Sequence, residues 1–122
     1  MSDVCDDLPR VICFQAEKVA HLRNTLPAED VLSGAAERLK ALAHPGRLAV
    51  VALLSEEECC VCDLAHTLGQ PVSTASQHLR RLRRAGLLES RQDGRLVFYS
   101  LSPTGRRLLP AMLSAAGTED GR

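Results

Sequence analysis

The sequence predicts a mainly α-helical domain with one β-hairpin, the arrangement of a winged helix-turn-helix. Three observations lead to this fold class. Apolar residues make up 45% of the chain but aromatic residues only 2%, and such an aliphatic core is typical of helices packed on helices. Two short helical segments meet at a glycine, as in a helix-turn-helix. An Asp-Gly pair then separates two short apolar runs, which is a hairpin pattern.

The length of 122 residues is that of a single domain with short tails. We expect an N-terminal arm with a short helix over 1–27, a DNA-binding and dimerisation domain over 28–116, and a frayed tail over 117–122. No apolar run approaches the roughly 20 residues that span a bilayer, and the N-terminus is acidic where a signal peptide would be basic. These features predict a cytoplasmic protein without a membrane partner.

Three helices are expected before the helix-turn-helix. The first covers 13–26 and ends at Pro27, and the second covers 28–43. Pro45 is well placed as the first residue of a third helix that reaches about Ser55. This third helix is apolar on most sides and should be the centre of the core. The second helix carries an apolar stripe made of Val31, Leu32, Ala35, Leu39 and Leu42.

The helix-turn-helix itself is predicted over two short helices. The first runs from Val61 to Leu68 and stops at Gly69, a residue that can adopt the left-handed conformation common at helix ends. Ser73 is a natural N-cap for the second, which runs to about Ala85. The predicted core positions of this unit are Leu64, Ala65, Val72, Ala75, Leu79 and Leu82.

A hairpin follows, and a hairpin directly after a recognition helix is a wing. Its strands are LLESR and LVFYSL, and residues Gln92 to Arg95 form the predicted turn. Ser102 or Thr104 can start a last helix. The apolar face of that helix has no further partner in the chain, so it could pair with a second subunit. This face consists of Leu108, Leu109, Met112 and Leu113.

The charge distribution places a DNA-binding surface in the second half of the chain. Residues 1–70 carry 6 basic and 11 acidic side chains (net −5), whereas residues 71–122 carry 9 and 4 (net +5). A recognition helix reads bases with polar side chains of its first turns, and cations hold the phosphates. Six arginines lie between residues 80 and 95. DNA contacts are predicted for Ser73, Thr74, Ser76, Gln77, His78, Arg80, Arg81, Arg84, Arg91 and Arg95.

The five cysteines favour metal binding or redox sensing, because a reducing compartment and an odd count both argue against a disulfide framework. Cys60 and Cys62 can converge on one ion where a helix begins, but two sulfurs do not complete a coordination sphere. Cys13 and Cys5 are the additional thiols available. For Cys59, packing as a small apolar residue and a chemical role are both open.

The run from Glu58 to Leu101, ECCVCDLAHTLGQPVSTASQHLRRLRRAGLLESRQDGRLVFYSL, resembles the ArsR/SmtB family of metal-responsive repressors. The upstream stretch LKALAHPGRLAVVALL is similar to the first core helices of that family. The most specific feature of the resemblance is the cysteine box Cys60-Val61-Cys62. The segment CFQAEKV, which begins at Cys13, resembles the N-terminal segment of the cadmium- and lead-sensing CadC branch.

This resemblance implies a homodimer that binds operator DNA without metal and releases it on binding a thiophilic ion. Cys13, Cys60 and Cys62 would be ligands, with the arm of one subunit reaching the other. Cys5 stands farther from Cys13 in the sequence than in that branch. Whether the ion has three thiolate ligands, or four with Cys5, is therefore open. Pro103 and Gly105 replace the ligands of a second site known in some members, so none is expected.

Several alternatives stay open at this point. Four ligands would suit Cd(II), with Zn(II) as an alternative, whereas three thiolates would suit Pb(II), As(III) or Sb(III). A cysteine redox switch on the same scaffold and a helical protein-interaction module are competing hypotheses. An enzyme is not expected, because the sequence contains no nucleophile and base pair and no phosphate-binding loop. No organic cofactor is expected either.

Overall fold

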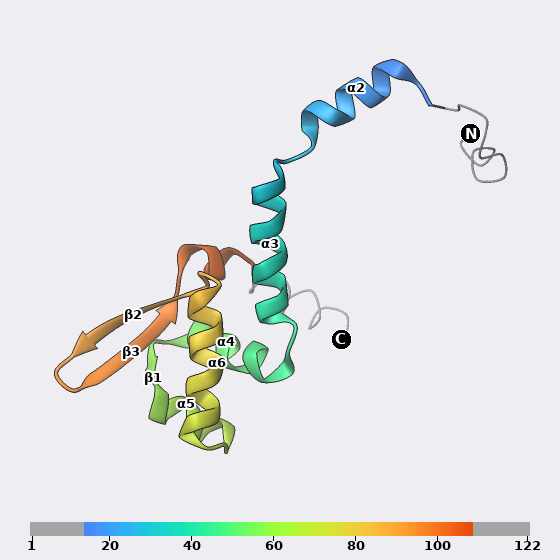
Figure 1. The fold of residues 1–122 in the computed structure, drawn as a ribbon. Coiled ribbons are helices and arrows are strands. Elements are labelled where there is room, and N and C mark those ends of the chain that lie inside the picture. Colours follow the sequence, from blue (N-terminus) through green and yellow to red (C-terminus); the bar gives the residue numbers. More distant parts are fainter. Residues whose placement is uncertain (1–13, 109–122) are drawn as a thin grey trace, which may run out of the picture. The chain divides into compact units, whose positions relative to one another are not determined.

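The computed structural model describes residues 14–108 (Figure 1). The chain divides into two compact units, Met1–Leu32 and Ser33–Arg122. Within the first unit, helix α2 (Ala16–Thr25) buries none of its side chains. Its C-cap, Leu26, is extended, because Pro27 disfavours the helical conformation for the residue before it. The predicted helix is therefore confirmed, with a start three residues later than expected.

The next two helices begin and end within about one residue of their predicted boundaries. α3 (Glu29–Leu42) is followed by α4 (Pro45–Glu56), which has Pro45 in its first turn. His44 is the N-cap of α4, and its Nδ1 accepts a hydrogen bond of 2.9 Å from the backbone N–H of Gly46. That bond satisfies one of the amide groups left free at a helix start.

The helix-turn-helix consists of α5 (Val61–Leu68) and α6 (Val72–Arg84). Gly69 ends α5 in the left-handed conformation with φ 64°, where a side chain would be strained. α6 begins two residues earlier than predicted, with Pro71 as its N-cap. Ser73 is therefore not the N-cap: the carbonyl of Pro71 accepts the first helical bonds, 3.1 Å from Thr74 N and 3.2 Å from Ala75 N. The exposed hydroxyl of Ser73 is left available for other contacts.

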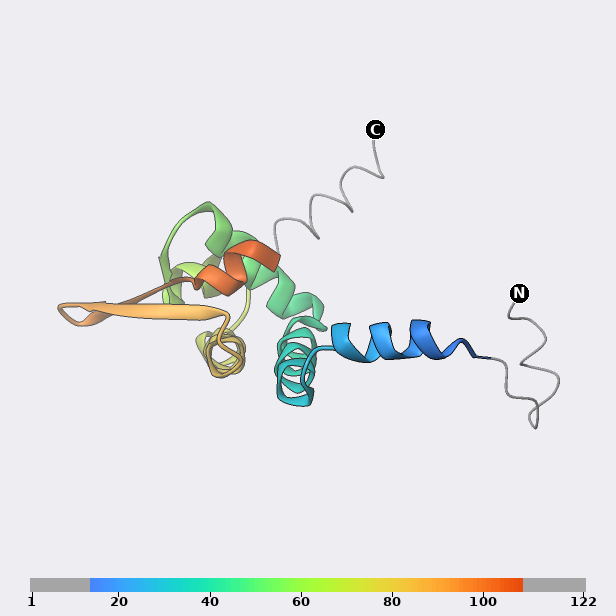
Figure 2. The same cartoon turned by 90° about the horizontal axis from the view of Figure 1, so that it is seen from above.

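The wing is the hairpin formed by β2 (Leu88–Asp93) and β3 (Leu96–Leu101). The register pairs Asp93 with Leu96, so the turn consists of Gly94 and Arg95 only and is shorter than predicted. Gly94 has φ 65°, the positive value that a two-residue hairpin turn requires at this position. Viewed from above, the hairpin is narrow and flat and extends away from the helices (Figure 2).

A third strand, β1 (Cys59–Cys60), was not predicted. It pairs antiparallel with β3, Cys59 opposite Tyr99 and Cys60 opposite Phe98, which places β3 in the middle of a three-stranded sheet of order β1-β3-β2. Two residues are too few to show the alternation that identifies a strand in sequence. The cysteine segment, Cys59 to Cys62, is therefore joined to the wing by backbone pairing.

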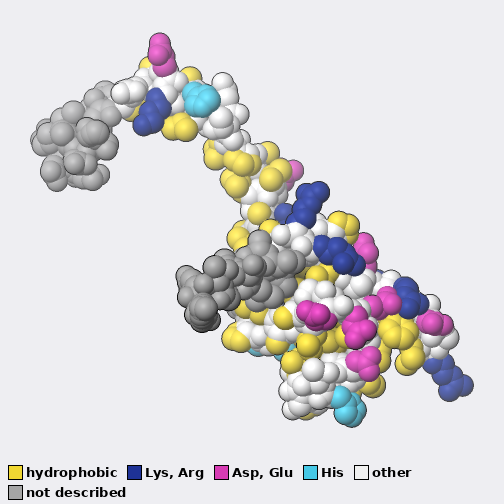
Figure 3. Space-filling view, turned by 180° about the vertical axis from the view of Figure 1, so that it is seen from behind, with side chains coloured by type: hydrophobic (Ala, Val, Ile, Leu, Met, Phe, Trp, Pro, Cys, Tyr) yellow, Lys and Arg dark blue, Asp and Glu magenta, His cyan; other side chains and the backbone are white. Residues whose placement is uncertain are grey.

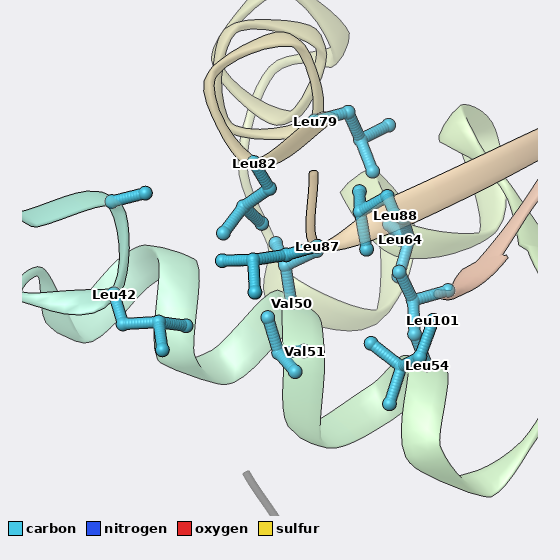
Figure 4. Close-up of a cluster of buried hydrophobic side chains, with 11 residues drawn as sticks. Leu42, Val50, Val51, Leu54, Leu64, Leu79, Leu82, Leu87, Leu88 and Leu101 are labelled. Atoms are coloured by element: carbon cyan, nitrogen blue, oxygen red, sulfur yellow. The ribbon is translucent and has the colours of Figure 1, made fainter. Parts of the chain in front are cut away.

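One aliphatic cluster holds these elements together (Figure 4). α4 contributes Val50, Val51 and Leu54, which are at most 3% exposed, so α4 is the central core helix as predicted. Of the expected core positions, only Val72 is wrong, since it is 45% exposed at the start of α6. The remaining large side chains of the cluster are Leu42, Leu64, Leu79, Leu82, Leu87, Leu88 and Leu101.

The apolar stripe of α3 is only partly used inside the chain. Leu42 is buried, whereas Val31, Leu32 and Leu39 are 56%, 45% and 50% exposed. The last helix starts after Ser102, whose Oγ donates to the carbonyl of Gly86 (2.7 Å) and accepts from Gly105 N (3.1 Å). Leu108 packs against the core. Leu109, Met112 and Leu113 lie outside the described residues. Across residues 14–108, no helix combines the length and apolarity needed to cross a membrane.

We predict that Leu64→Ala lowers the free energy of unfolding by about 2 to 5 kcal/mol, because Leu64 is fully buried and its neighbours cannot close the cavity. Urea unfolding followed by circular dichroism measures this change. Leu96→Ala is the control: Leu96 is 51% exposed at the wing tip, and its loss should change stability by less than about 0.5 kcal/mol. Equal effects of the two substitutions would contradict the assigned core.

Candidate nucleic-acid interface and cysteine segment

Helix α6 has one buried and one exposed face. Ala75, Leu79 and Leu82 are at most 2% exposed. On the opposite face, exposed residues recur every three or four positions and form a stripe along the helix. Thr74 and Ser76 lie beside this stripe and are half-buried. A stripe of short polar groups followed by cations is what a major groove and its phosphates require of a recognition helix. The exposed stripe consists of Ser73, Gln77, Arg80 and Arg84.

Between α6 and the wing lies a hollow with a basic rim. Ser76, Arg80, Arg83, Arg84 and Tyr99 line it, with Leu79 at its base. Three guanidinium groups and two hydroxyls can hold a phosphate diester by charge-assisted hydrogen bonds. Sequence reasoning counted Arg83 among the cations without assigning it to DNA and missed Tyr99. Tyr99 lines the hollow from β3, so only the folded structure brings it beside the arginines of α6.

Two residues expected at the DNA are placed elsewhere by their neighbours. Arg81 Nη2 lies 4.0 Å from Glu37 Oε1 of α3, and its side chain is 29% exposed. The half-buried ring of His78 lies 5.0 Å from that of His44, centroid to centroid. Burial, followed by the charges of His44 and Arg47, lowers the pKa of His78. Arg81 thus contacts α3, and His78 contacts the residue that caps α4. The DNA contacts expected for these two residues stay predictions without structural support.

The two wing arginines differ in the same way. Arg95 is exposed in the turn at the tip of the hairpin, where a wing reaches the adjacent sugar-phosphate backbone. Arg91 is held by a carboxylate: its Nε and Nη2 donate to Oε2 and Oε1 of Glu58, both at 2.8 Å. Glu58 is therefore bound by a specific partner, although it belongs to a run of three acidic residues, Glu56 to Glu58.

Cys59 is a packing residue in this structure. It is half-buried in β1 and contacts the core cluster. Burial raises the pKa of its thiol, and the charges of Asp63 and Glu57 add to the shift. A thiol with a raised pKa is a weak metal ligand, because the thiolate is the form that binds.

Cys60 and Cys62 lie at the start of α5, as predicted. Cys60 forms a reciprocal capping box with Asp63, whose carboxylate accepts from the Cys60 backbone N–H at 3.4 Å. Cys62 is exposed in the first turn of the helix. It lines a shallow hollow in the surface, and acidic side chains gather on one face of this unit (Figure 3). The hollow is lined by Glu57, Glu58, Cys59, Cys62, Asp63, His66 and Thr67.

His66 is a further donor that sequence reasoning left unassigned. It lies one turn after Cys62 in α5, and its Nδ1 is 3.1 Å from the carbonyl oxygen of Cys62. A carbonyl only accepts, so a hydrogen bond here requires the proton on Nδ1, and that tautomer presents the lone pair of Nε2 to a ligand. This arrangement, with the second ring nitrogen bonded to a backbone carbonyl, is usual for metal-binding histidines.

The described residues do not complete a metal site by themselves. Within residues 14–108, no three His, Cys, Asp or Glu side chains lie close enough to hold one ion. Cys13 and Cys5, the other two predicted ligands, lie outside the described residues. The donor set that is present, two thiols with an imidazole nearby, suits a thiophilic ion but needs at least one more ligand.

Comparison with known proteins shows the family. Residues 44–90 match the family described as "Bacterial regulatory protein, arsR family". The cadmium resistance transcriptional regulatory protein CadC of Listeria innocua is 34% identical over 99 residues, which cover 80% of this chain and 79% of that protein. The chain belongs to the ArsR family of bacterial regulatory proteins.

Other relatives agree with this assignment. The arsenical resistance operon repressor of Escherichia coli is 51% identical to this ArsR-family chain over 65 residues, which cover 52% of the chain and 56% of the repressor. A homodimeric winged helix-turn-helix DNA-binding domain of Mycobacterium bovis, Mb0332, superposes with a TM-score of 0.66 at 29% identity, covering 86% of this chain and 90% of that one. The chain is thus a DNA-binding transcriptional regulator with a winged helix-turn-helix, not an enzyme.

We predict that Arg83→Ala lowers the salt dependence of DNA binding by about one unit of log Kd per log salt concentration, because one phosphate contact in the hollow is lost. Fluorescence anisotropy between low and moderate salt measures the slope, with a duplex selected by the wild-type protein from a random pool. Arg81→Ala is the matched control and should leave the slope unchanged. A slope that falls in Arg81→Ala but not in Arg83→Ala would contradict the assignment of the hollow to phosphate binding.

Proposed function

We propose that the chain is a metal-responsive transcriptional repressor that binds operator DNA as a homodimer and releases it on binding a thiophilic ion, Cd(II) or Pb(II). The observation that carries this proposal is the position of Cys60 and Cys62. Both lie in the first turn of α5 or directly before it, and α5 is the first helix of the DNA-reading unit. A ligand held there acts on the helix-turn-helix directly.

A homodimer is supported by the surface of α3. Three of the five members of its apolar stripe, Val31, Leu32 and Leu39, are exposed, whereas Ala35 is half-buried and Leu42 is buried. An exposed apolar face of this kind is stable when covered. The related Mb0332 domain is described as homodimeric. A dimer also presents two recognition helices to successive major grooves.

The proposed ligands are Cys60 and Cys62 together with Cys13 from the N-terminal arm, reaching the site from the partner subunit. A tetrahedral ion needs a fourth donor. Cys5 was the predicted candidate. His66, which lines the same hollow as Cys62, is a second, and it would bind the same ion only if His66, Cys60 and Cys62 move closer together than they lie in this structure. Three thiolates alone would favour As(III), Sb(III) or Pb(II), whereas a mixed set with His66 would favour Cd(II) or Zn(II).

Release requires that the ion stabilises one dimer geometry more than the other. A bound ion would link the N-terminal arm to the start of α5 and so restrain the orientation of the helix-turn-helix. Typical coupling free energies of about 1 to 3 kcal/mol change DNA affinity by about 5- to 150-fold. The redox alternative is less well supported, because Cys59, the nearest resolving thiol, is packed and has a raised pKa.

We predict that Cys60→Ser and Cys62→Ser each abolish the near-ultraviolet thiolate absorption of the Cd(II) complex and DNA release by Cd(II), while binding of the metal-free protein to DNA persists. Serine keeps the size of the side chain but is not a soft ligand. Parallel titrations with Cd(II), Pb(II) and As(III) identify the preferred ion. Cys59→Ser is the control and should retain both signals. Release that persists in both variants would refute the proposal.

The fourth donor is tested by comparing His66→Asn with Cys5→Ser. If His66 binds the ion, His66→Asn weakens Cd(II) affinity by about tenfold or more without lowering the thiolate absorption, and Cys5→Ser changes neither. Competition with a chelator gives the affinity. His21→Asn, which replaces an exposed histidine of α2, is the control. A loss of absorption in Cys5→Ser, with His66→Asn unchanged, would instead assign the position to Cys5.

A further inference from the structure

An ion pair connects the cysteine segment to the middle of the wing. Glu58 stands directly before β1, and Arg91 lies in β2, 33 residues later. Their side chains meet in a bidentate arrangement with two hydrogen bonds of 2.8 Å. Two parallel N–H···O bonds fix direction as well as distance. The pair therefore defines how the two segments are oriented.

Phe98 lies at the centre of this contact. It pairs with Cys60 of β1 on one side and with Arg91 of β2 on the other. The guanidinium carbon of Arg91 is 4.8 Å from the centroid of the Phe98 ring, within the range of a cation–π interaction. Glu58, Arg91 and Phe98 thus form one cluster, the clamp, that connects the residue before β1 with β2 and β3.

The clamp matters because β1 is so short. Only two residue pairs join β1 to β3, and Figure 1 shows the hairpin extending far beyond this pairing. The base of the hairpin is held by Leu88 and Leu101 in the core, and Tyr99 of β3 packs against that core. Arg91 and Phe98 lie farther along the strands, toward the turn. The clamp supplies a second attachment between the cysteine segment and the wing.

The charge of Arg91 is already neutralised within the clamp. Besides the two bonds to Glu58, its Nη1 lies 3.8 Å from Asp93 Oδ2. Arg91 is better placed to position the wing than to bind a phosphate, which changes the role expected from sequence.

We propose that the clamp of Glu58, Arg91 and Phe98 transmits the state of the cysteine segment to the wing. This inference rests on the proposed metal response. Glu58 precedes Cys60 by two residues, and Cys60 is itself paired with Phe98. A shift of this segment therefore moves both the carboxylate that holds Arg91 and the strand beside the ring. The wing follows, and its arginine at the tip, Arg95, changes position with it.

The experiment compares DNA affinity with and without Cd(II) in the full-length protein. The ratio of the two dissociation constants measures coupling, with fluorescence anisotropy on the duplex selected by the wild-type protein. Glu58→Gln keeps the shape of the side chain but removes its charge. We expect it to reduce the ratio by at least about fivefold while the thiolate absorption of the Cd(II) complex is unchanged. Arg91→Lys should do the same, and the double variant should show no further loss.

Glu89→Gln is the matched control, because it removes the same charge from an exposed position of β2 that forms no ion pair within residues 14–108. A merely structural role of the clamp would weaken DNA binding equally with and without Cd(II). A ratio for Glu58→Gln within about twofold of wild type would overturn the inference alone. A wild-type protein whose DNA affinity ignores Cd(II) would overturn the proposed function and this inference together.

Discussion

The burial of one face of α6 is the constraint on which the DNA-binding surface depends. Leu79 and Leu82 enter the same aliphatic core as Val50 and Leu64, and this packing fixes the rotation of the helix about its axis. Because an α-helix repeats every 3.6 residues, the exposed stripe is then determined. Ser73 and Arg80 face outward, and Arg81 turns toward α3. The core thus selects which arginines can reach DNA.

The second organising feature is the segment from Glu58 to Cys62. It provides the third strand of the sheet, the start of α5 and the carboxylate that holds Arg91. The cysteines and the start of the helix-turn-helix therefore share one stretch of backbone. Under the proposed function, an ion at the cysteines would need no long path through the core, because α5 begins there and β1 pairs with β3 of the wing.

Most elements could be predicted from the sequence because each has a local cause. Pro45 marks the start of α4, Gly69 ends α5, and Gly94 forms the hairpin turn. The errors also have physical reasons. β1 is too short for a periodic pattern, and it exists only because β3 passes beside it. Ser73 has the preferred chemistry of an N-cap, but the extended conformation of Pro71 starts the helix earlier.

By itself, the sequence determined the order of the elements, the basic second half of the chain and the presence of thiols before a recognition helix. These depend on residue types and on spacings of a few positions. Only the tertiary structure decided that Arg83 and Tyr99 share a hollow and that Glu58 binds Arg91. The partners in each of these contacts come from distant parts of the chain. Their meeting depends on how helices and strands pack, which no local pattern records.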